Sequence, residues 1–307
     1  MEHILNILPS AIRSVFSESG IDFQKLQEIR LRIDKPVLLI YENEEQFLKK
    51  GTDLCFVTKE QIKECMEYIS NYSLYAFEEE MRQGFITIQG GHRIGIAGKA
   101  VLKGSRVQNM RYISFINIRL AHQIQGCADF LMKYIAQANT VYPTLIISPP
   151  RCGKTTILRD IIRQISNGFS GLAGKSVGVV DERSELGACY MGVPQNDLGL
   201  RTDVLDCCPK AEGMMMLIRS MAPEVIAVDE IGMKEDIEAM AYARNCGCTL
   251  IATAHGNSME DIRTKPVLGQ LIKEHAFCRY IVLGKEGRAG TVCQIFDERE
   301  RLLYGEC

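Results

Sequence analysis

Short apolar runs alternate with amphipathic segments after Tyr142-Pro143. The pattern predicts strands over 144–148, 176–181, 224–229, 248–253, 280–283 and 291–296, with a turn at 285–288. It predicts helices over 155–165, 211–221 and 234–245. Apolar strands that alternate with helices are typical of a mostly parallel sheet covered on both faces. Such sheets bind ligands at the carboxyl ends of their strands.

The first part of the chain has a different pattern. It predicts strands over 36–41 and 114–120, a hairpin or a bent sheet over the glycine-containing stretch 85–104, and a helix over 58–70 that Thr58 caps. We therefore predict an α/β protein with two domains. A smaller α+β domain covers residues 1–139, and a domain with a mostly parallel sheet covers residues 140–307.

Composition narrows the functional class. The chain has 307 residues, of which 46% are hydrophobic and 24% charged, and its net charge is −2. These values are typical of a globular protein. The net charge excludes a strongly basic protein whose overall field would attract nucleic acid. No apolar stretch approaches the ~18 residues of a membrane helix. The start, MEHILNILPS, lacks the features of a signal peptide, so we expect a cytoplasmic protein.

A phosphate-binding loop is the strongest motif. The stretch SPPRCGKTT follows a predicted strand and opens a predicted helix, where backbone amides can surround phosphate oxygens. Lys154 would reach the β- and γ-phosphates, and the Thr155 hydroxyl would bind Mg²⁺. The alternative is an ordinary strand–helix turn. The residues expected around the nucleotide are Ser148, which replaces the usual first glycine, Pro149, Pro150, Arg151, Cys152, Gly153, Lys154, Thr155 and Thr156.

Two carboxylates follow the apolar strand in PEVIAVDE. Asp229 would hold Mg²⁺ through water, and Glu230 would act as the general base toward the attacking water. A solvated acidic turn is the alternative interpretation. The pair favours hydrolysis over kinase-type transfer, because an attacking water needs a base.

Two further strand ends carry polar groups. Glu182, in DERSEL, is a candidate second base or Mg²⁺ contact, although a solvated turn explains it equally well. Thr253 and His255, in ATAHGNS, stand where a side chain can sense a γ-phosphate. The alternative for His255 is a structural histidine. The guanine-specificity motif N-K-x-D and the LSGGQ-type signature of transport ATPases are both absent from the sequence.

In chain order, the segments SPPRCGKTT, DERSEL, PEVIAVDE and ATAHGNS resemble the secretion-ATPase branch of the RecA-like and AAA+ ATPases. They correspond to its Walker A loop, Asp box, Walker B strand and His box. A closer resemblance, over roughly residues 75 to 300, is to a sporulation family of spore-forming bacteria. The segments that carry it are GGHRIGIAGKAV, PQNDLGLRTDVLDCCPKAEGMMMLIRSMAPEVIAVDEIG and ATAHGNSMEDI.

The resemblance implies a RecA-like P-loop core that hydrolyses ATP with Mg²⁺. It also implies a hexameric ring that powers the assembly or operation of a secretion-like channel complex between mother cell and forespore. The ring would be cytoplasmic, on the mother cell side, and would reach the membrane through membrane-protein partners. The carried-over residues are Lys154, Thr155, Glu182, Asp229, Glu230 and His255. Pilus-type relatives often have Gly-Glu where this chain has Asp229-Glu230.

Ring ATPases usually complete their site with an arginine from the neighbouring subunit. We expect Arg93 to have this role, because a glycine-rich strand can approach a neighbour closely. Two other functions stay open, a RecA-like motor acting on nucleic acid and a nucleotide-gated scaffold with little turnover. The other arginine candidates are Arg111, Arg119, Arg201 and Arg219.

Overall fold

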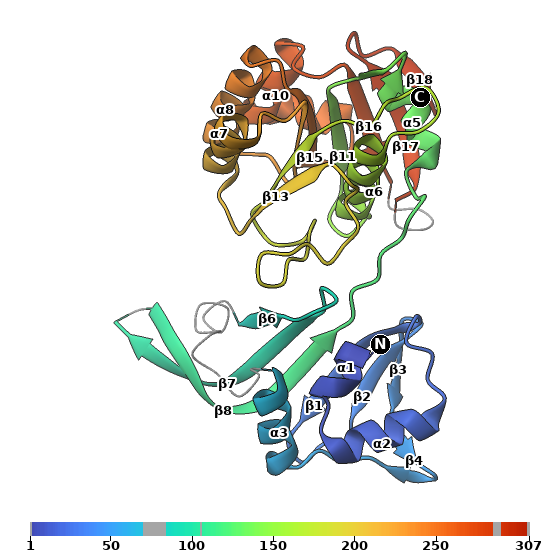
Figure 1. Ribbon diagram of the computed structural model, residues 1–307, viewed down its shortest axis with the longest axis vertical. Helices are drawn as coiled ribbons and strands as arrows, with labels where there is room; N and C mark the ends of the chain where they lie inside the picture. The colour runs from blue at the N-terminus through green and yellow to red at the C-terminus, as the bar shows by residue number, and fades with distance from the viewer. Residues whose placement is uncertain (1, 70–83, 105, 285–289, 306–307) are drawn as a thin grey trace. The chain divides into compact units, whose positions relative to one another are not determined.

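The computed structural model describes residues 2–69, 84–104, 106–284 and 290–305 and divides into two compact units (Figure 1). The first unit comprises Met1–His122 together with Ala188–Gln195. The second unit comprises Gln123–Gly187 and Asn196–Cys307. Each unit has its own hydrophobic core, and each is described separately below.

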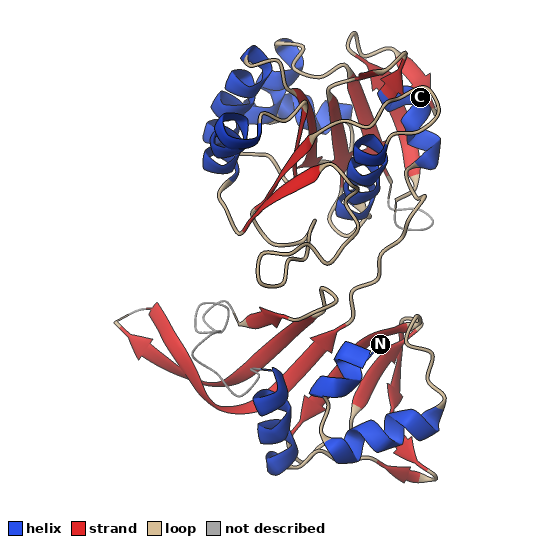
Figure 2. Cartoon of the chain, viewed as in Figure 1, coloured by secondary structure: helices blue, strands red, loops and turns tan. Residues whose placement is uncertain are grey.

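The first unit is an antiparallel sheet with helices. Its strands lie in the order β3-β2-β1-β8-β7-β6. Figure 2 shows its strands in red and its helices in blue. The strands are β1 (Leu26–Arg32), β2 (Leu38–Tyr41), β3 (Glu44–Phe47), β6 (Phe85–Thr87), β7 (Arg93–Lys103) and β8 (Arg106–Arg119), with a small pair β4 (Lys49–Lys50) and β5 (Asp53–Leu54); the helices are α1 (Glu2–Ile7), α2 (Ser10–Ser19) and α3 (Lys59–Ile69).

Local sequence explains helix α3. The Thr58 hydroxyl accepts a hydrogen bond from the Gln61 amide at 3.2 Å, and the Gln61 side chain accepts one from the Thr58 amide at 2.9 Å. This reciprocal capping box fixes the start of the helix. The buried residues recur at helical spacing and are Ile62, Cys65, Met66 and Ile69. The predicted helix is confirmed up to Ile69; Ser70 lies outside the described residues. The predicted hairpin is also confirmed, as β6 and β7.

The second unit contains an eight-stranded sheet in the order β13-β12-β14-β15-β11-β16-β17-β18. The strands from β13 to β16 are parallel, and β17 and β18 are added antiparallel. The mostly parallel sheet is therefore confirmed. Its strands are β11 (Thr144–Ser148), β12 (Val177–Asp181), β13 (Thr202–Asp206), β14 (Val225–Val228), β15 (Thr249–His255), β16 (Arg279–Leu283), β17 (Val292–Asp297) and β18 (Leu302–Tyr304), with a small pair β9 (Ala136–Gln137) and β10 (Thr140–Val141) outside it.

Helices cover both faces of this sheet. In β11, Leu145 and Ile147 belong to one core cluster, whereas Ile146 between them belongs to another. Side chains alternate across a strand, so the two clusters lie on opposite faces. The Leu145 side packs against α7 (Lys210–Met221), α8 (Lys234–Asn245), α9 (Met259–Thr264) and α10 (Pro266–Lys273), and the Ile146 side packs against α5 (Asp129–Ile135) and α6 (Lys154–Asn167).

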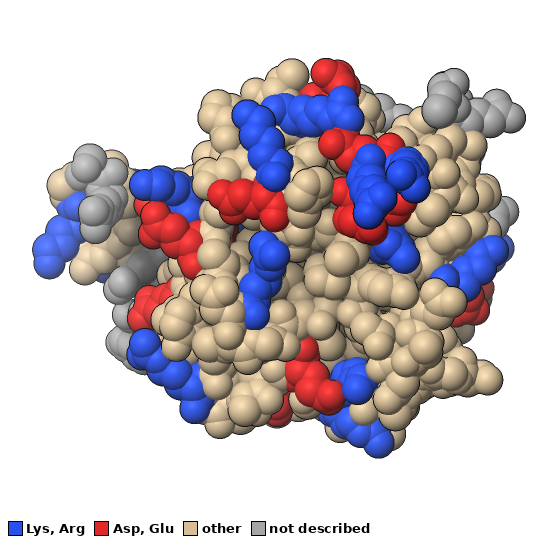
Figure 3. All heavy atoms as spheres, turned by 90° about the horizontal axis from the view of Figure 1, so that it is seen from above, with Lys and Arg blue, Asp and Glu red and all other residues tan. Residues whose placement is uncertain are grey.

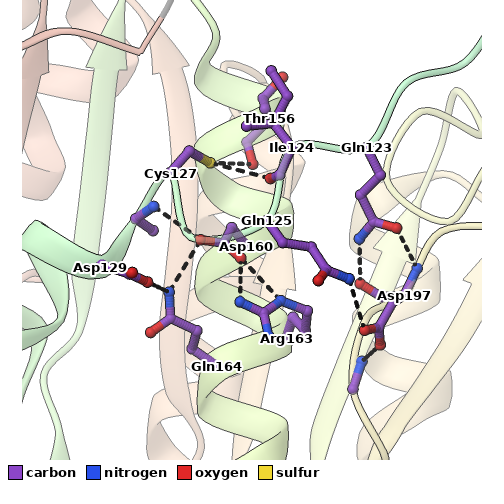
Figure 4. A network of polar contacts seen from close by, with 12 residues as sticks. Gln123, Ile124, Gln125, Cys127, Asp129, Thr156, Asp160, Arg163, Gln164 and Asp197 are labelled. Carbon is purple, nitrogen blue, oxygen red and sulfur yellow. Dashed lines mark hydrogen bonds and ion pairs between the residues drawn. The ribbon is translucent and has the colours of Figure 1, made fainter. Parts of the chain in front are cut away.

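The units divide between His122 and Gln123, whereas the sequence places the domain boundary between residues 139 and 140. The difference arises because α5 packs with α6 in the second core. A buried carboxylate ties the two helices together (Figure 4). Asp160, 2% exposed, accepts hydrogen bonds from the Ala128 amide at 2.9 Å, from Arg163 and from Gln164. Whether residues 1–139 and 140–307 fold as separate domains stays a prediction.

Residues 188–195 leave the second unit and join the first. Asn196 donates to the Gly187 carbonyl at 3.1 Å and so closes the base of this excursion. Within the first unit, the Gly90 amide donates to Gln195 Oε1 at 2.8 Å. A side chain at Gly91, whose φ is +74°, would begin 3.0 Å from the Ala188 methyl group. Glycine at this position therefore allows the close approach.

Candidate active site

The loop between β11 and α6 has the backbone shape of a phosphate cradle. Gly153, the residue before α6, has a φ of +86°, and Arg151 has a φ of +63°. Left-handed residues of this kind turn successive amides toward the helix N-terminus, where they form an anion-binding concavity. Ser148 keeps its strand register opposite His255, and its carbonyl accepts a hydrogen bond from Gly256 at 3.1 Å. The serine in place of glycine therefore leaves the end of β11 regular.

Lys154 and Glu230 form an ion pair at the centre of the site. The distance from Lys154 Nζ to Glu230 Oε1 is 2.5 Å, and the exposed fractions of the two side chains are only 8% and 15%. His255 Nε2 lies 3.0 Å from the same carboxylate oxygen, and Arg183 Nη1 lies 2.6 Å from the other. Glu230 has a φ of +57°. Strained backbone of this kind is common at functional sites.

These contacts control the ionisation of Glu230. Burial raises the pKa of its carboxyl group, but the hydrogen bond and charge of Lys154, with the charges of Arg183 and His255, lower it by more. The net pKa is therefore below the ordinary value for glutamate. Glu230 is an anion at neutral pH, which is the form that can accept a proton from water.

Thr155 and Asp229 lie together beside this pair. Thr155 Oγ1 donates to Asp229 Oδ2 at 2.7 Å, and the Thr253 hydroxyl donates to Asp229 Oδ1. The Thr253 hydroxyl also accepts a hydrogen bond from the Glu230 amide at 2.9 Å. Thr253, fully buried in β15, thus fixes both residues that follow β14.

The donor set fits magnesium. A hydroxyl and a carboxylate are hard oxygen ligands, and Mg²⁺ is usually held by few protein groups plus water and substrate phosphates. Among the described residues, no group of three or more His, Cys, Asp or Glu could hold a metal. Thr155 and Asp229 could therefore hold Mg²⁺ in the open manner of phosphoryl-transfer sites.

A pocket of about 700 Å³ adjoins this cluster. Glu230, His255 and Glu182 line it together with the first turns of α7, α8 and α10. The Glu182 carboxylate forms an ion pair with Lys210, so its negative charge is compensated. The structure brings Lys154, Thr155, Asp229, Glu230 and His255 into one network, with Glu182 in the adjoining pocket.

Asp181 shapes the turn before Glu182. It accepts hydrogen bonds from the amides of Glu185, Leu186 and Gly187 at 2.7–2.8 Å. Burial nevertheless raises the pKa of Asp181 to about 6, and the nearby Asp206 adds to the increase. The turn that carries Arg183 toward Glu230 is therefore built around this carboxyl group.

The remaining predicted residues occupy several positions. In the loop, the Cys152 carbonyl accepts a hydrogen bond from Gly290 at 2.8 Å. Arg93 is on β7 in the first unit, 4.8 Å above the Phe85 ring. Arg201 donates to the Ser166 carbonyl at 3.0 Å. The others are Pro149, Pro150, Thr156 (in the first turn of α6), Arg111 and Arg219 (both exposed) and Arg119 (3.5 Å from Glu28).

Sequence reasoning missed Arg183 and did not specify which groups Thr253 contacts. Arg183 received no role, although a cation two residues after Asp181, the carboxylate that ends a neighbouring strand, was a usable signal. Thr253 was expected to sense phosphate, but its hydroxyl links Asp229 to the Glu230 backbone. This link depends on β14 and β15 being neighbours, which the sequence pattern alone does not specify.

Comparison with known proteins identifies the family. A family model described as "Sporulation stage III, protein AA" matches residues 1–303. The chain belongs to the sporulation stage III protein AA family. Stage III sporulation protein AA of Bacillus subtilis (strain 168) is 42% identical over 304 residues, which cover 99% of this chain and 97% of that protein. The protein ycf45 of Porphyra purpurea is 23% identical over 97% of this chain and 48% of its own length.

Solved structures show the fold of this family member. The ATPase DotB of Legionella pneumophila superimposes with a TM-score of 0.61 over 95% of this chain and 81% of its own, at 15% identity. The pilus retraction motor PilT with bound ADP superimposes with a TM-score of 0.60 over 89% and 76%, also at 15% identity. The predicted RecA-like α/β fold is therefore confirmed. In the described part of the chain, no helix is both long and apolar enough to cross a membrane.

Proposed function

We propose that this protein hydrolyses ATP with Mg²⁺ to power the assembly or operation of a secretion-like channel complex during sporulation. One observation carries the proposal. Lys154 and Thr155, which begin α6, contact Glu230 and Asp229, which follow β14, at 2.5 and 2.7 Å. A cation for phosphate, oxygen ligands for Mg²⁺ and a base for water thus converge at the carboxyl ends of parallel strands.

Different residues bind the phosphates, hold the metal ion and orient the base. The loop amides and Lys154 bind the phosphates, while Thr155 and Asp229 hold Mg²⁺, which would neutralise phosphate charge. Phosphate oxygens compete with Glu230 for the Lys154 ammonium group, so nucleotide binding would release one oxygen of Glu230 to accept a proton from water. His255 and Arg183 keep the carboxylate oriented.

The proposal extends to assembly and location. We place the protein in the cytoplasm on the mother cell side, as a hexamer bound to membrane proteins of the channel complex. Arg93 is our candidate for the arginine supplied to the neighbouring subunit. These assignments, with Glu182 as an auxiliary acid–base group, belong to the proposal.

Phosphate release from ATP, measured over a wide range of protein concentration, tests the proposal. We expect turnover per subunit to rise with concentration, to require Mg²⁺ and to fall by about 10²–10⁴-fold in Glu230→Gln, the effect of losing a general base. Glu235→Gln is the matched control, because Glu235 lines the same pocket without contacting Lys154. Turnover that is equal in Glu230→Gln and the wild type would overturn the proposal.

The scaffold function has one observation in its favour. Glu230 is held by Lys154, Arg183 and His255 at once, which would suppress turnover until a partner or nucleotide separates them. ATP binding without phosphate release at any concentration would support it. A nucleic-acid motor has less support, because Lys and Arg lie among Asp and Glu on the face shown in Figure 3.

A further inference from the structure

A two-stranded ribbon extends from the sheet of the first unit. Only the first part of β7 pairs with β6, at Arg93–Gly95, and only the end of β8 pairs with β1, at 115–119. Beyond these contacts, residues 99–103 of β7 pair with residues 106–111 of β8 and with no other described strand (Figure 1). We call the described residues 98–104 and 106–112 the arm.

The arm lies in a stretch of unusual charge. Residues 81–128 contain seven Lys and Arg and no Asp or Glu, in a chain whose net charge is −2. Acidic residues make up 38 of the 307, so their absence over this length is a marked asymmetry. The arm therefore carries uncompensated positive charge in its own sequence.

Like charges face each other across the arm. Lys99 lies directly opposite Arg111 in the register of β7 and β8. Cross-strand pairs of like charge are destabilising. Lys99, Lys103 and Arg111 are exposed, and no ion pair joins them to another described residue. An anionic partner would relieve this repulsion.

The other face of the arm is apolar. Successive residues of a strand point to opposite faces, so Ala100 and Leu102 lie opposite the face of Lys99 and Lys103. Leu102 pairs with Val107, and their exposed fractions are 61% and 42%. Tyr112, at the base of the ribbon, is 76% exposed. An exposed aliphatic pair beside cations that form no ion pair with another described residue makes the arm amphipathic.

We propose that the arm docks directly on an anionic lipid bilayer. Its apolar face would enter the boundary between headgroups and acyl chains, and its cations would contact the lipid phosphates. The exposed Leu102–Val107 pair gives the arm an apolar surface that suits acyl chains, next to cations that suit lipid phosphates. Because few side chains would insert, binding by one arm is weak and several arms on one assembly would reinforce it.

Co-sedimentation of the full chain with lipid vesicles tests this inference independently of ATP hydrolysis. The vesicles are phosphatidylcholine alone or phosphatidylcholine mixed with phosphatidylglycerol. We expect the wild type to bind only the anionic vesicles and to dissociate at high salt. Charge reversal in Lys99→Glu with Arg111→Glu should weaken binding by about tenfold or more.

A matched control distinguishes the loss of the arm's cations from a general change in the protein's net charge. Lys49→Glu with Lys50→Glu makes the same charge change on exposed residues of β4 and should bind like the wild type. Equal loss in both double variants, or wild-type binding that salt does not alter, would overturn the inference. The salt titration uses unmodified protein, so the test holds even if a variant fails to fold.

Leu102→Ser distinguishes lipid from other polyanions. We expect it to weaken vesicle binding while leaving retention on a heparin column unchanged, because heparin meets only the cationic face. If Leu102→Ser binds the anionic vesicles as tightly as the wild type, the apolar face does not enter the bilayer and the lipid inference is wrong.

Discussion

Lys154 Nζ lies 2.5 Å from Glu230 Oε1, so the cation expected to bind phosphate is neutralised by the base expected to activate water. The two side chains come from α6 and from the end of β14, and both are largely buried. Neither can reach its partner in the reaction without loosening its hold on the other. Nucleotide binding and activation of the base are thereby coupled through one ion pair.

Replacing Lys154 with alanine should abolish nucleotide binding and also raise the pKa of Glu230. The second effect follows because Lys154 is the main group that lowers this pKa against the effect of burial. Calorimetric titration with ATP and Mg²⁺ measures the first effect. Lys175→Ala, which removes an ion-paired lysine elsewhere in the second unit, is the control and should leave affinity unchanged. Retained affinity in Lys154→Ala would contradict the site.

Thr253→Val should reduce both stability and hydrolysis. The substitution keeps the shape of the side chain but removes the hydroxyl that contacts Asp229 and the Glu230 amide. A buried amide without a partner costs about 1–3 kcal/mol, which urea denaturation would detect. Thr249 lies at the start of the same strand, and its hydroxyl forms no hydrogen bond with another described residue. Thr249→Val should therefore change stability very little. Equal stability of the two variants would argue against this link.

Asp160→Ala should destabilise the second unit by about 3 kcal/mol or more, since it strips partners from a buried amide and from Arg163. The measurement is the free energy of unfolding in urea. Asp129→Ala removes a more exposed carboxylate that contacts Gln164, and its effect should be much smaller. Similar losses in both variants would show that the network in Figure 4 does not depend on Asp160.

Arg93→Ala should bind nucleotide normally but hydrolyse it more slowly in the assembled protein. An arginine supplied to a phosphoryl-transfer site is worth about 10³-fold or more in rate. Phosphate release at saturating ATP measures the effect, with Arg119→Ala, its cross-strand neighbour, for comparison. Unchanged turnover of the assembled Arg93→Ala protein would remove Arg93 from consideration.

Acidification should destabilise the first unit through His92. Burial lowers the pKa of His92 to about 4, and its Nδ1 accepts a hydrogen bond from the Ala121 amide at 3.0 Å. The folded state therefore binds the proton more weakly than the unfolded state. Stability is present above the unfolded pKa of about 6.5 and is lost as the pH falls toward 4.

Between pH 7 and pH 5 the loss should be about 1 kcal/mol, a value reduced for the partial exposure of the ring. Urea denaturation at several pH values measures it. His92→Asn, which cannot titrate in this range, should show a flatter profile. A wild-type profile equally flat between pH 7 and pH 5 would contradict the role of this histidine.

The sequence was sufficient for features that depend on local pattern. Apolar strands followed by polar residues predicted β11, β12, β14 and β15 and placed Lys154, Asp229 and His255 at their carboxyl ends, where the structure has them. This works because parallel strands share one edge for their carboxyl ends, so strand order is not needed to bring the residues near one another.

Features that depend on tertiary contacts could not be predicted. Strand β13 was missed because only partly buried and exposed residues make up TDVLD at the sheet edge, which gives no apolar run. The contact of Arg183 with Glu230 depends on how the turn wraps around Asp181. Helix α5 precedes the predicted boundary yet packs in the second core, because its apolar residues do not reveal which core they enter.

The excursion of residues 188–195 means that the backbone crosses from one unit to the other at three places, after His122, after Gly187 and after Gln195. Proteolysis after His122 would leave only the eight-residue peptide of the first unit covalently joined to the second unit, whereas a cut after Gly187 or Gln195 would leave residues 1–122 joined to it. Expressing residues 1–122 alone would omit eight residues of the first unit, including the Gln195 side chain that binds the Gly90 amide. Truncation experiments must therefore supply this peptide separately, or graft it, before the first unit can be judged unstable by itself.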